Sequence, residues 1–155
     1  MSNLSDLPAA QTLLDNTQIT HRSIGRYIAH CAVPCRNLEE AAKWYTEVIG
    51  VQLVRKLDDR VTFSVGGVLQ LVCHLERRNI DVNPRAYPRH TGLTMLDKAD
   101  FDRMRDHILN LGIKFLMKPA LRFADTTHEH ECFMIVDPSG NVVEFKCYMR
   151  PECSY

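Results

Sequence analysis

Two histidines and one carboxylate stand out because each lies in an otherwise apolar stretch. His30 lies in YIAHCAV, His90 in PRHTGLTM and Glu144 in NVVEFKCY. Two imidazoles and a carboxylate have the composition of a 2-His-1-carboxylate set, which holds one face of a divalent ion and leaves the other positions open. The ion would also offset the cost of burying Glu144. Taken singly, each histidine is more often a core or strand-edge residue than a ligand, and Glu144 could equally be half-exposed or paired with Lys146.

The hydrophobic pattern predicts that these residues lie on strands of two similar modules. From Tyr27 onward, strand and helix signals alternate in the order β-α-β-β-β, twice. Each helix is expected to begin at a capping residue, Asn37 or Asp97, and to end at a glycine, Gly50 or Gly112. The predicted strands are residues 27–33, 51–57, 60–65, 68–75, 89–96, 113–117, 131–136 and 142–148. Residues 118–130 are expected to form a loop, and the proline at position 34 is expected to close the first strand.

The two modules also match residue by residue. GGVLQLVCH (66–74) aligns without a gap on GNVVEFKCY (140–148), which sets Gln70 against Glu144. His30 precedes the helix-ending glycine of its module by 20 residues and His90 by 22, so we place the two histidines at equivalent positions. Internal repetition of this kind indicates two like units. We predict an α+β fold in which two tandem βαβββ modules form a cup-shaped mixed sheet.

Strand alternation suggests which further side chains face the same surface as these candidates. Glu144 and Tyr148 share one side of the last strand, and the repeat puts Gln70 and His74 on the matching side of the first module. An imidazole at 74 could act as an acid or base, and the Tyr148 hydroxyl could donate a hydrogen bond to a substrate oxygen. Water-bonded rim positions are the alternative for both.

The segment before the seventh strand gave weaker expectations. We interpret His128 and His130 as part of a solvated loop. Arg122 and Phe123 could form a lid or contact a substrate carboxylate. Residues 1–25 are expected to be an N-terminal arm, 26–150 one domain with modules at 26–75 and 88–150, and 151–155 a C-terminal tail.

Composition narrows the class of protein. Nineteen basic and nineteen acidic residues give no net charge, which argues against a nucleic-acid partner or an anionic membrane surface. No apolar run is long enough to cross a membrane, and the N-terminus lacks the features of a secretory signal. Six cysteines without such a signal are expected to be reduced thiols. We therefore expect a cytoplasmic protein.

The paired modules and two motifs, DPSGNVVEF and NLEEAAKWYTEVIGVQL, resemble the vicinal oxygen chelate superfamily, over about residues 26–150. That superfamily includes glyoxalase I, fosfomycin and bleomycin resistance proteins and extradiol dioxygenases. The resemblance implies metal ligands on the opening and last strands of each module, where this chain has His30, Gln70, His90 and Glu144. In bacterial glyoxalase I the corresponding positions resemble a His-Glu-His-Glu ligand order. In this chain Gln70 therefore stands where the resemblance implies a carboxylate that could act as a base. Without Gln70, the remaining His-His-Glu set resembles the metal ligands of dioxygenases and fosfomycin-type transferases.

The resemblance therefore implies a metal-dependent enzyme, dioxygenase-like, that acts on a small-molecule substrate as a homodimer. His74, Tyr148 and Glu144 are the expected catalytic residues. The metal is expected to be one divalent ion, iron or alternatively nickel, zinc or manganese, acting as a Lewis acid. Two alternatives stay open: a glyoxalase-like lyase acting on a hemithioacetal, and a metal-free protein that binds a small molecule such as a drug.

Overall fold

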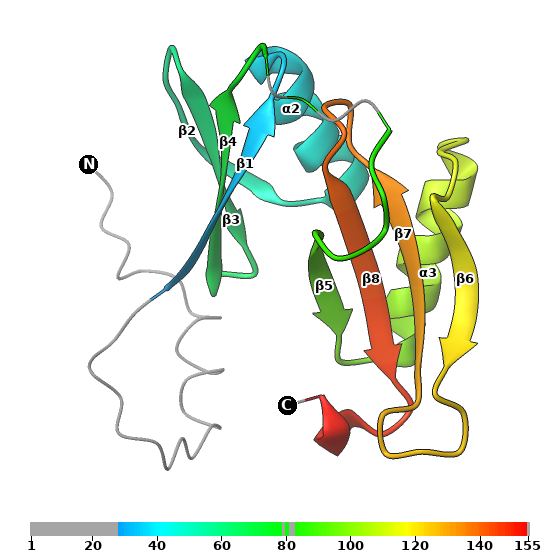
Figure 1. The fold of residues 1–155 in the computed structure, drawn as a ribbon. Helices are drawn as coiled ribbons and strands as arrows, with labels where there is room; N and C mark the ends of the chain where they lie inside the picture. The colour runs from blue at the N-terminus through cyan, green and yellow to red at the C-terminus, as the bar shows by residue number, and fades with distance from the viewer. Residues whose placement is uncertain (1–27, 79, 81–82, 155) are drawn as a thin grey trace. The chain divides into compact units, whose positions relative to one another are not determined.

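The computed structural model describes residues 28–78, 80 and 83–154, and the predicted arm at 1–25 lies outside them. The chain divides into two compact units with the boundary between Leu75 and Glu76, and each is described here by itself (Figure 1). Each unit contains one four-stranded sheet and runs in the order β-α-β-β-β. The predicted α+β fold with two tandem βαβββ modules is confirmed.

The first unit has the sheet order β1-β4-β3-β2. Its strands are β1 (Ala29–Cys35), β2 (Gln52–Lys56), β3 (Arg60–Val65) and β4 (Leu69–Leu75). Helix α2 (Leu38–Trp44) continues as one turn of wider helix, η2 (Tyr45–Ile49). Asn37 caps α2 as predicted, because its Oδ1 accepts hydrogen bonds from the backbone N–H groups of Glu39 and Glu40, at 2.9 and 3.1 Å. Gly50 ends η2 with a φ of 79°, a left-handed conformation that favours glycine.

Pro34 does not close the first strand, contrary to the prediction. Strand β1 continues through Pro34 to Cys35, and Pro34 pairs with His74 of β4. Proline cannot donate a backbone hydrogen bond, but β1 is the edge strand of its sheet. A proline is tolerated on an edge strand where its nitrogen faces away from the neighbour.

The second unit repeats this arrangement with the sheet order β5-β8-β7-β6. Its strands are β5 (Thr91–Met95), β6 (Met117–Arg122), β7 (His130–Val136) and β8 (Val142–Tyr148). Helix α3 (Lys98–Asn110) begins after Asp97, whose Oδ1 accepts a 2.6 Å hydrogen bond from the backbone N–H of Ala99. The predicted bounds of β8 match those observed. The C-terminal segment contains one short turn, η3 (Pro151–Cys153).

The sixth strand is displaced from its prediction. We expected a strand at residues 113–117 and a loop at 118–130, whereas β6 runs from Met117 to Arg122. Strand β6 contains Pro119, which is tolerated because β6 is an edge strand and its pairing with β7 is irregular between Met117 and Ala120. The loop is correspondingly shorter, and His130 is the first residue of β7.

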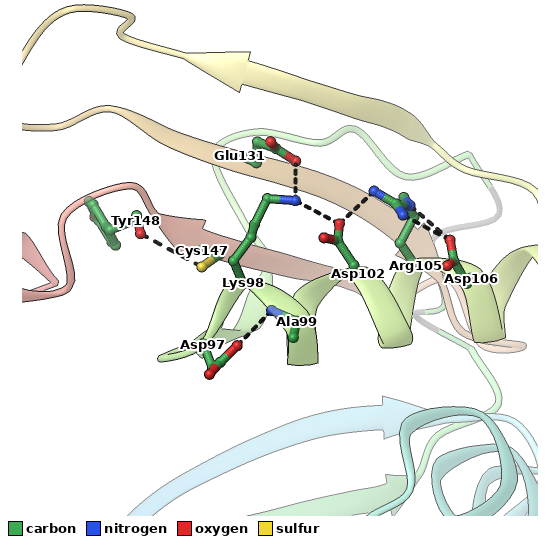
Figure 2. Close-up of polar contacts among 9 residues, drawn as sticks. All are labelled: Asp97, Lys98, Ala99, Asp102, Arg105, Asp106, Glu131, Cys147 and Tyr148. Carbon is green, nitrogen blue, oxygen red and sulfur yellow. Dashed lines mark hydrogen bonds and ion pairs between the residues drawn. The ribbon is translucent and has the colours of Figure 1, made fainter.

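Helix α3 packs on one face of the second sheet (Figure 1). The ring of Phe101 on α3 lies 5.3 Å from that of Phe133 on β7, and Phe133 stacks on Phe145 of β8 at 5.0 Å. Lys98 ties the start of α3 to the same face, with its Nζ 3.4 Å from Glu131 Oε2 (Figure 2). In the described part of the chain, no helix combines the length and apolar character needed to cross a membrane.

Candidate functional site

The packing of α3 fixes which side chains of β8 face the opposite surface. Phe133 and Phe145 face the helix, and successive side chains of a strand alternate between faces. Glu144, Lys146 and Tyr148 therefore lie on the face of the sheet away from α3. This division between an apolar helix side and a polar side agrees with the sequence prediction.

The turn between β7 and β8 holds Glu144 in its register. Asp137 Oδ1 accepts hydrogen bonds from the backbone N–H groups of Ser139 and Asn141, both at 2.8 Å. Gly140 adopts a φ of 88°, which the tight turn requires and glycine allows. The turn thus sets the pairing in which Met134 of β7 lies opposite Glu144 of β8.

The Glu144 carboxylate is buried against two nitrogen groups. Its side chain is 5% exposed, and its Oε2 lies 3.3 Å from His90 Nε2 and 3.1 Å from Lys146 Nζ. Burial alone would lower the pKa of Lys146, but the hydrogen bond and the charge of Glu144 outweigh it, and the pKa is raised. Lys146 is therefore a charged ammonium at neutral pH. Glu144 therefore makes both contacts considered from the sequence, an ion pair with Lys146 and a contact with a histidine.

The hydrogen bond on the other side of the His90 ring determines what Nε2 can do. His90 Nδ1 lies 3.2 Å from the backbone carbonyl oxygen of Ala86. A carbonyl oxygen only accepts, so Nδ1 carries the hydrogen, and a neutral His90 presents the Nε2 lone pair to Glu144. Two lone pairs facing each other repel unless a proton or a metal ion lies between them. A histidine that ligates a metal through one nitrogen usually donates its other N–H to such a carbonyl.

The first unit contains a second pair of the same kind. His30 lies directly opposite Gln70 on the neighbouring parallel strand, and its Nδ1 is 3.1 Å from Gln70 Oε1. The amide oxygen accepts, so Nδ1 again carries the hydrogen and Nε2 keeps its lone pair. Both side chains lie in the exposed part of β1 and β4.

The two histidines do not occupy equivalent register positions, which corrects the prediction. Gly92, not His90, lies opposite Glu144 in the pairing of β5 with β8, whereas His30 itself lies opposite Gln70. His90 precedes Gly92 by two residues and lies just outside β5. The two-residue difference in spacing to the helix-ending glycines reflects this offset. His90 nevertheless contacts Glu144 because side chains two residues apart face the same side.

His74 lies away from the candidate ligand of its own unit. It follows Gln70 by four residues on β4, a separation of about 13 Å along an extended strand. It pairs with Arg60 of β3. The hydrogen bond from Arg60 lowers the pKa of Asp59, and the nearby His74 acts on that carboxylate in the same direction. His74 is thus next to an Asp–Arg pair at the end of the strand.

Tyr148 lies beside a histidine that sequence reasoning missed. Tyr148 pairs with His130 of β7, and the two rings are 5.1 Å apart. His130 is buried, with 8% exposed, which corrects its interpretation as a solvated loop residue. Its Nδ1 donates to the His128 carbonyl oxygen at 2.7 Å. The ring of Phe123 lies 5.7 Å from that of His130. The alternation in HEHECF (128–133) could have predicted this placement, because it puts His130 on the same face of β7 as Cys132.

Arg122 and Cys132 complete the polar face of the second unit. Arg122 pairs with His130, and Cys132 lies between Ala120 and Lys146 in the sheet. Arg122 Nη2 is 3.0 Å from the sulfur of Met117. Burial, and to a lesser degree Glu144, raises the pKa of the Cys132 thiol against the opposing influence of Arg122. The thiol therefore stays protonated at neutral pH.

Comparisons with known proteins agree with this fold. The family model of the Glyoxalase/Bleomycin resistance protein/Dioxygenase superfamily matches residues 27–145. A glyoxalase/bleomycin resistance protein/dioxygenase from Alicyclobacillus acidocaldarius is 39% identical, with a TM-score of 0.77, and the match covers 83% of this chain and 96% of that one. The chain belongs to the glyoxalase/bleomycin resistance protein/dioxygenase superfamily.

More distant superfamily members share the fold. A lactoylglutathione lyase from Agrobacterium tumefaciens is 24% identical with a TM-score of 0.62, and the match covers 79% of this chain and 94% of the lyase. A glyoxalase/dioxygenase from Nostoc punctiforme is 17% identical, also with a TM-score of 0.62. The match covers 81% of this chain and 92% of the Nostoc punctiforme chain. At these identities the likeness concerns the fold alone.

The two histidines and their oxygen partners supply the donor types that a divalent metal ion requires. Among residues 28–78, 80 and 83–154, no three His, Cys, Asp or Glu side chains lie together as a metal site. Each unit instead provides one histidine beside an oxygen group, His30 with Gln70 and His90 with Glu144. In both histidines Nδ1 lies against an acceptor oxygen, which leaves Nε2 as the nitrogen that could ligate a metal ion. The donor types therefore fit a divalent ion.

Proposed function

We propose that this protein is a metal-dependent enzyme of the vicinal oxygen chelate type with dioxygenase-like chemistry. His30, His90 and Glu144 are the proposed ligands of one divalent ion, iron or alternatively nickel, zinc or manganese. A bound ion of this kind supplies Lewis-acid stabilisation of charge on substrate oxygens and, if it is iron, the redox chemistry for using oxygen. Its substrate is a small molecule, and the protein acts as a homodimer.

The observation that supports the proposal is the contact between His90 and Glu144. The carbonyl oxygen of Ala86 accepts a hydrogen bond from His90 Nδ1. The Nε2 atom of a neutral His90 therefore directs its lone pair at the buried Oε2 of Glu144, 3.3 Å away. A cation between these atoms removes the repulsion and offsets the cost of burying the carboxylate. A proton on Nε2 is the competing explanation, so metal content is the quantity to measure.

Gln70 has a supporting role in this proposal. Its amide oxygen accepts the Nδ1 hydrogen of His30, which orients the His30 ring and leaves Nε2 for the ion. An amide cannot act as the base that a lyase needs for abstracting a carbon-bound proton. This favours dioxygenase-like over lyase chemistry, with His74 and Tyr148 as the proposed acid–base and hydrogen-bonding groups.

The test is metal analysis of purified wild type and four variants. His30→Ala, His90→Ala and Glu144→Gln are expected to lose the about one equivalent of metal that wild type holds per chain. His128→Ala is the matched control, because its exposed side chain makes no polar contact among the described residues. Equal, negligible metal in wild type and His90→Ala would refute the proposal and favour a binding protein.

Activity then separates the two enzyme classes. The iron-loaded wild type is expected to consume oxygen with catechols. Metal binding without oxygen uptake, together with turnover of methylglyoxal and a thiol, would instead identify a lyase. Thermal unfolding of each variant shows whether a loss of metal reflects a lost ligand or a lost fold.

A further inference from the structure

We propose that the polar face of the second sheet binds the carboxylate of a small organic acid that carries a planar group, with Arg122 as the main contact. The inference rests on the proposed function and narrows it, because it names the substrate class of the same enzyme. It concerns the part of this face around Arg122, on β6, β7 and β8, the last of which also carries the candidate ligand Glu144.

The charges on this face favour an anion. At the paired positions of β5 to β8 that face away from α3, the described residues include two permanent cations, Arg122 and Lys146, and one carboxylate, Glu144. Glu144 is already engaged by Lys146 and His90. The face therefore keeps an excess positive charge centred on Arg122.

Arg122 has the bonding capacity to accept a ligand. Its neighbours among the described residues are the thioether of Met117, at 3.0 Å, and the protonated thiol of Cys132, both weak acceptors. Among the described residues, no carboxylate lies within ion-pair distance of its guanidinium. A planar guanidinium with several donors matches a carboxylate through two parallel hydrogen bonds. Arg122 is also exposed at the end of β6.

The neighbours of Arg122 suit a planar group attached to the carboxylate. The rings of Phe123 and Tyr148 both contact the ring of His130, with centroid separations of 5.7 and 5.1 Å. Phe123 is 65% exposed and is held with a left-handed φ of 51°. The hydroxyl of Thr126 donates a 2.7 Å hydrogen bond to its carbonyl oxygen, which stabilises that unusual conformation. The backbone of Phe123, the residue after Arg122, is thus held in place, and its exposed ring is available for stacking.

The test measures binding of benzoate to the full chain after dialysis against a chelator, so that it does not depend on metal. Benzoate is expected to bind wild type saturably, and the neutral analogue benzyl alcohol at least about tenfold more weakly. Arg122→Ala is expected to weaken benzoate binding by about tenfold or more. Arg122→Lys should weaken it less, because lysine keeps the positive charge but lacks the two parallel N–H donors of the guanidinium. Amide chemical shifts should change around residues 120–123, 130–132 and 146–148.

Arg103→Ala is the matched control, since Arg103 carries the same charge on α3, where it pairs with Asp100. Its benzoate affinity should equal that of wild type. Equal affinity of wild type and Arg122→Ala, equal binding of benzyl alcohol, or no saturable benzoate binding would each overturn the inference. Thermal midpoints establish that the variants fold. A protein that binds benzoate through Arg122 but holds no metal would retain this inference while refuting the proposed metal chemistry.

Discussion

Gly92 lies directly opposite Glu144 on the neighbouring parallel strand, and a Cβ atom added at Gly92 would lie 2.7 Å from the Glu144 carbonyl oxygen. It would also lie 3.1 Å from Glu144 Cβ. Glycine here lets β5 approach β8 closely at the point where the candidate carboxylate leaves the sheet. The identity of this residue thus follows from the position of Glu144.

Gly92→Ala is expected to lower the free energy of unfolding by about 1–3 kcal/mol, because the added methyl group forces the two strands apart. Urea denaturation measures this loss, and metal content should fall with it as Glu144 shifts. Gly50→Ala is a useful comparison, since nothing lies within 4 Å of a Cβ there and only the left-handed φ opposes it. Wild-type stability of Gly92→Ala would contradict the predicted clash.

Lys146→Met is expected to strengthen metal binding by about tenfold, because the Lys146 ammonium competes with a metal ion for the same Glu144 oxygen. Methionine keeps the length of the side chain without its charge. Competition with a metal indicator at fixed pH measures the affinity. Lys98→Met is the control, since Lys98 lies on the helix side of the sheet, and it should leave the affinity unchanged. Unchanged or weaker binding in Lys146→Met would exclude competition between Lys146 and the metal.

The six cysteines are free thiols, as predicted, and their reactivity should follow burial. Burial raises the pKa of Cys31, Cys132 and Cys147 above the ordinary thiol value, so little thiolate exists at pH 7. Iodoacetamide followed by mass spectrometry is expected to label the half-buried Cys31 before the buried Cys132 and Cys147. Its rate at Cys31 should rise about tenfold per pH unit from pH 7. Labelling of native Cys132 as fast as Cys31 would show that this strand opens readily.

Asp102 should make stability depend on pH in the acid range. Its hydrogen bond with Lys98 lowers the pKa of Asp102, and Arg105 acts in the same direction (Figure 2). A carboxyl group with a lowered folded-state pKa stabilises the fold above its ordinary value of about 3.9, and this contribution is lost as the pH falls through the lower folded-state value. Asp102→Asn should therefore be less stable than wild type at pH 7.

Urea midpoints at pH 7 and below about pH 3 test this prediction, because the two proteins should converge once Asp102 is protonated. Asp58→Asn, in an exposed turn of the first unit, should change neither midpoint. A difference between wild type and Asp102→Asn that persists unchanged at low pH would show that Asp102 acts through packing and not through its charge.

The sequence predicted most accurately the elements whose signals are local. Strand β8 matched because a β-branched run follows a strong turn sequence, and the helix ends matched because Asn37 and Asp97 cap them. The prediction that Pro34 closes the first strand was wrong because a proline can lie within a strand at the edge of a sheet. Edge position is a property of the assembled sheet, which no local pattern contains.

The candidate site was predicted in part for a similar reason. Alternation along β8 indicated that Glu144 faces away from the core, and the repeat linked it to Gln70. The role of the His90 ring depends on its contact with the Ala86 carbonyl oxygen. Ala86 lies in an irregular segment before β5, where no strand or helix pattern predicts the contact. The burial of His130 likewise depends on Tyr148 and Phe123, which come from other parts of the chain.

The parallel pairing of β1 with β4 and of β5 with β8 joins the first and last strands of each module. His30 and Gln70 are 40 residues apart in the chain, whereas the antiparallel neighbours within each module are joined by much shorter connections. Closing the longer loop costs more chain entropy, so hairpins such as β3–β4 are expected to form before the opening strand of each module, β1 or β5, docks. Each histidine is thus expected to meet its partner late in folding, and a ligand that bridges the pair is expected to slow the first step of unfolding.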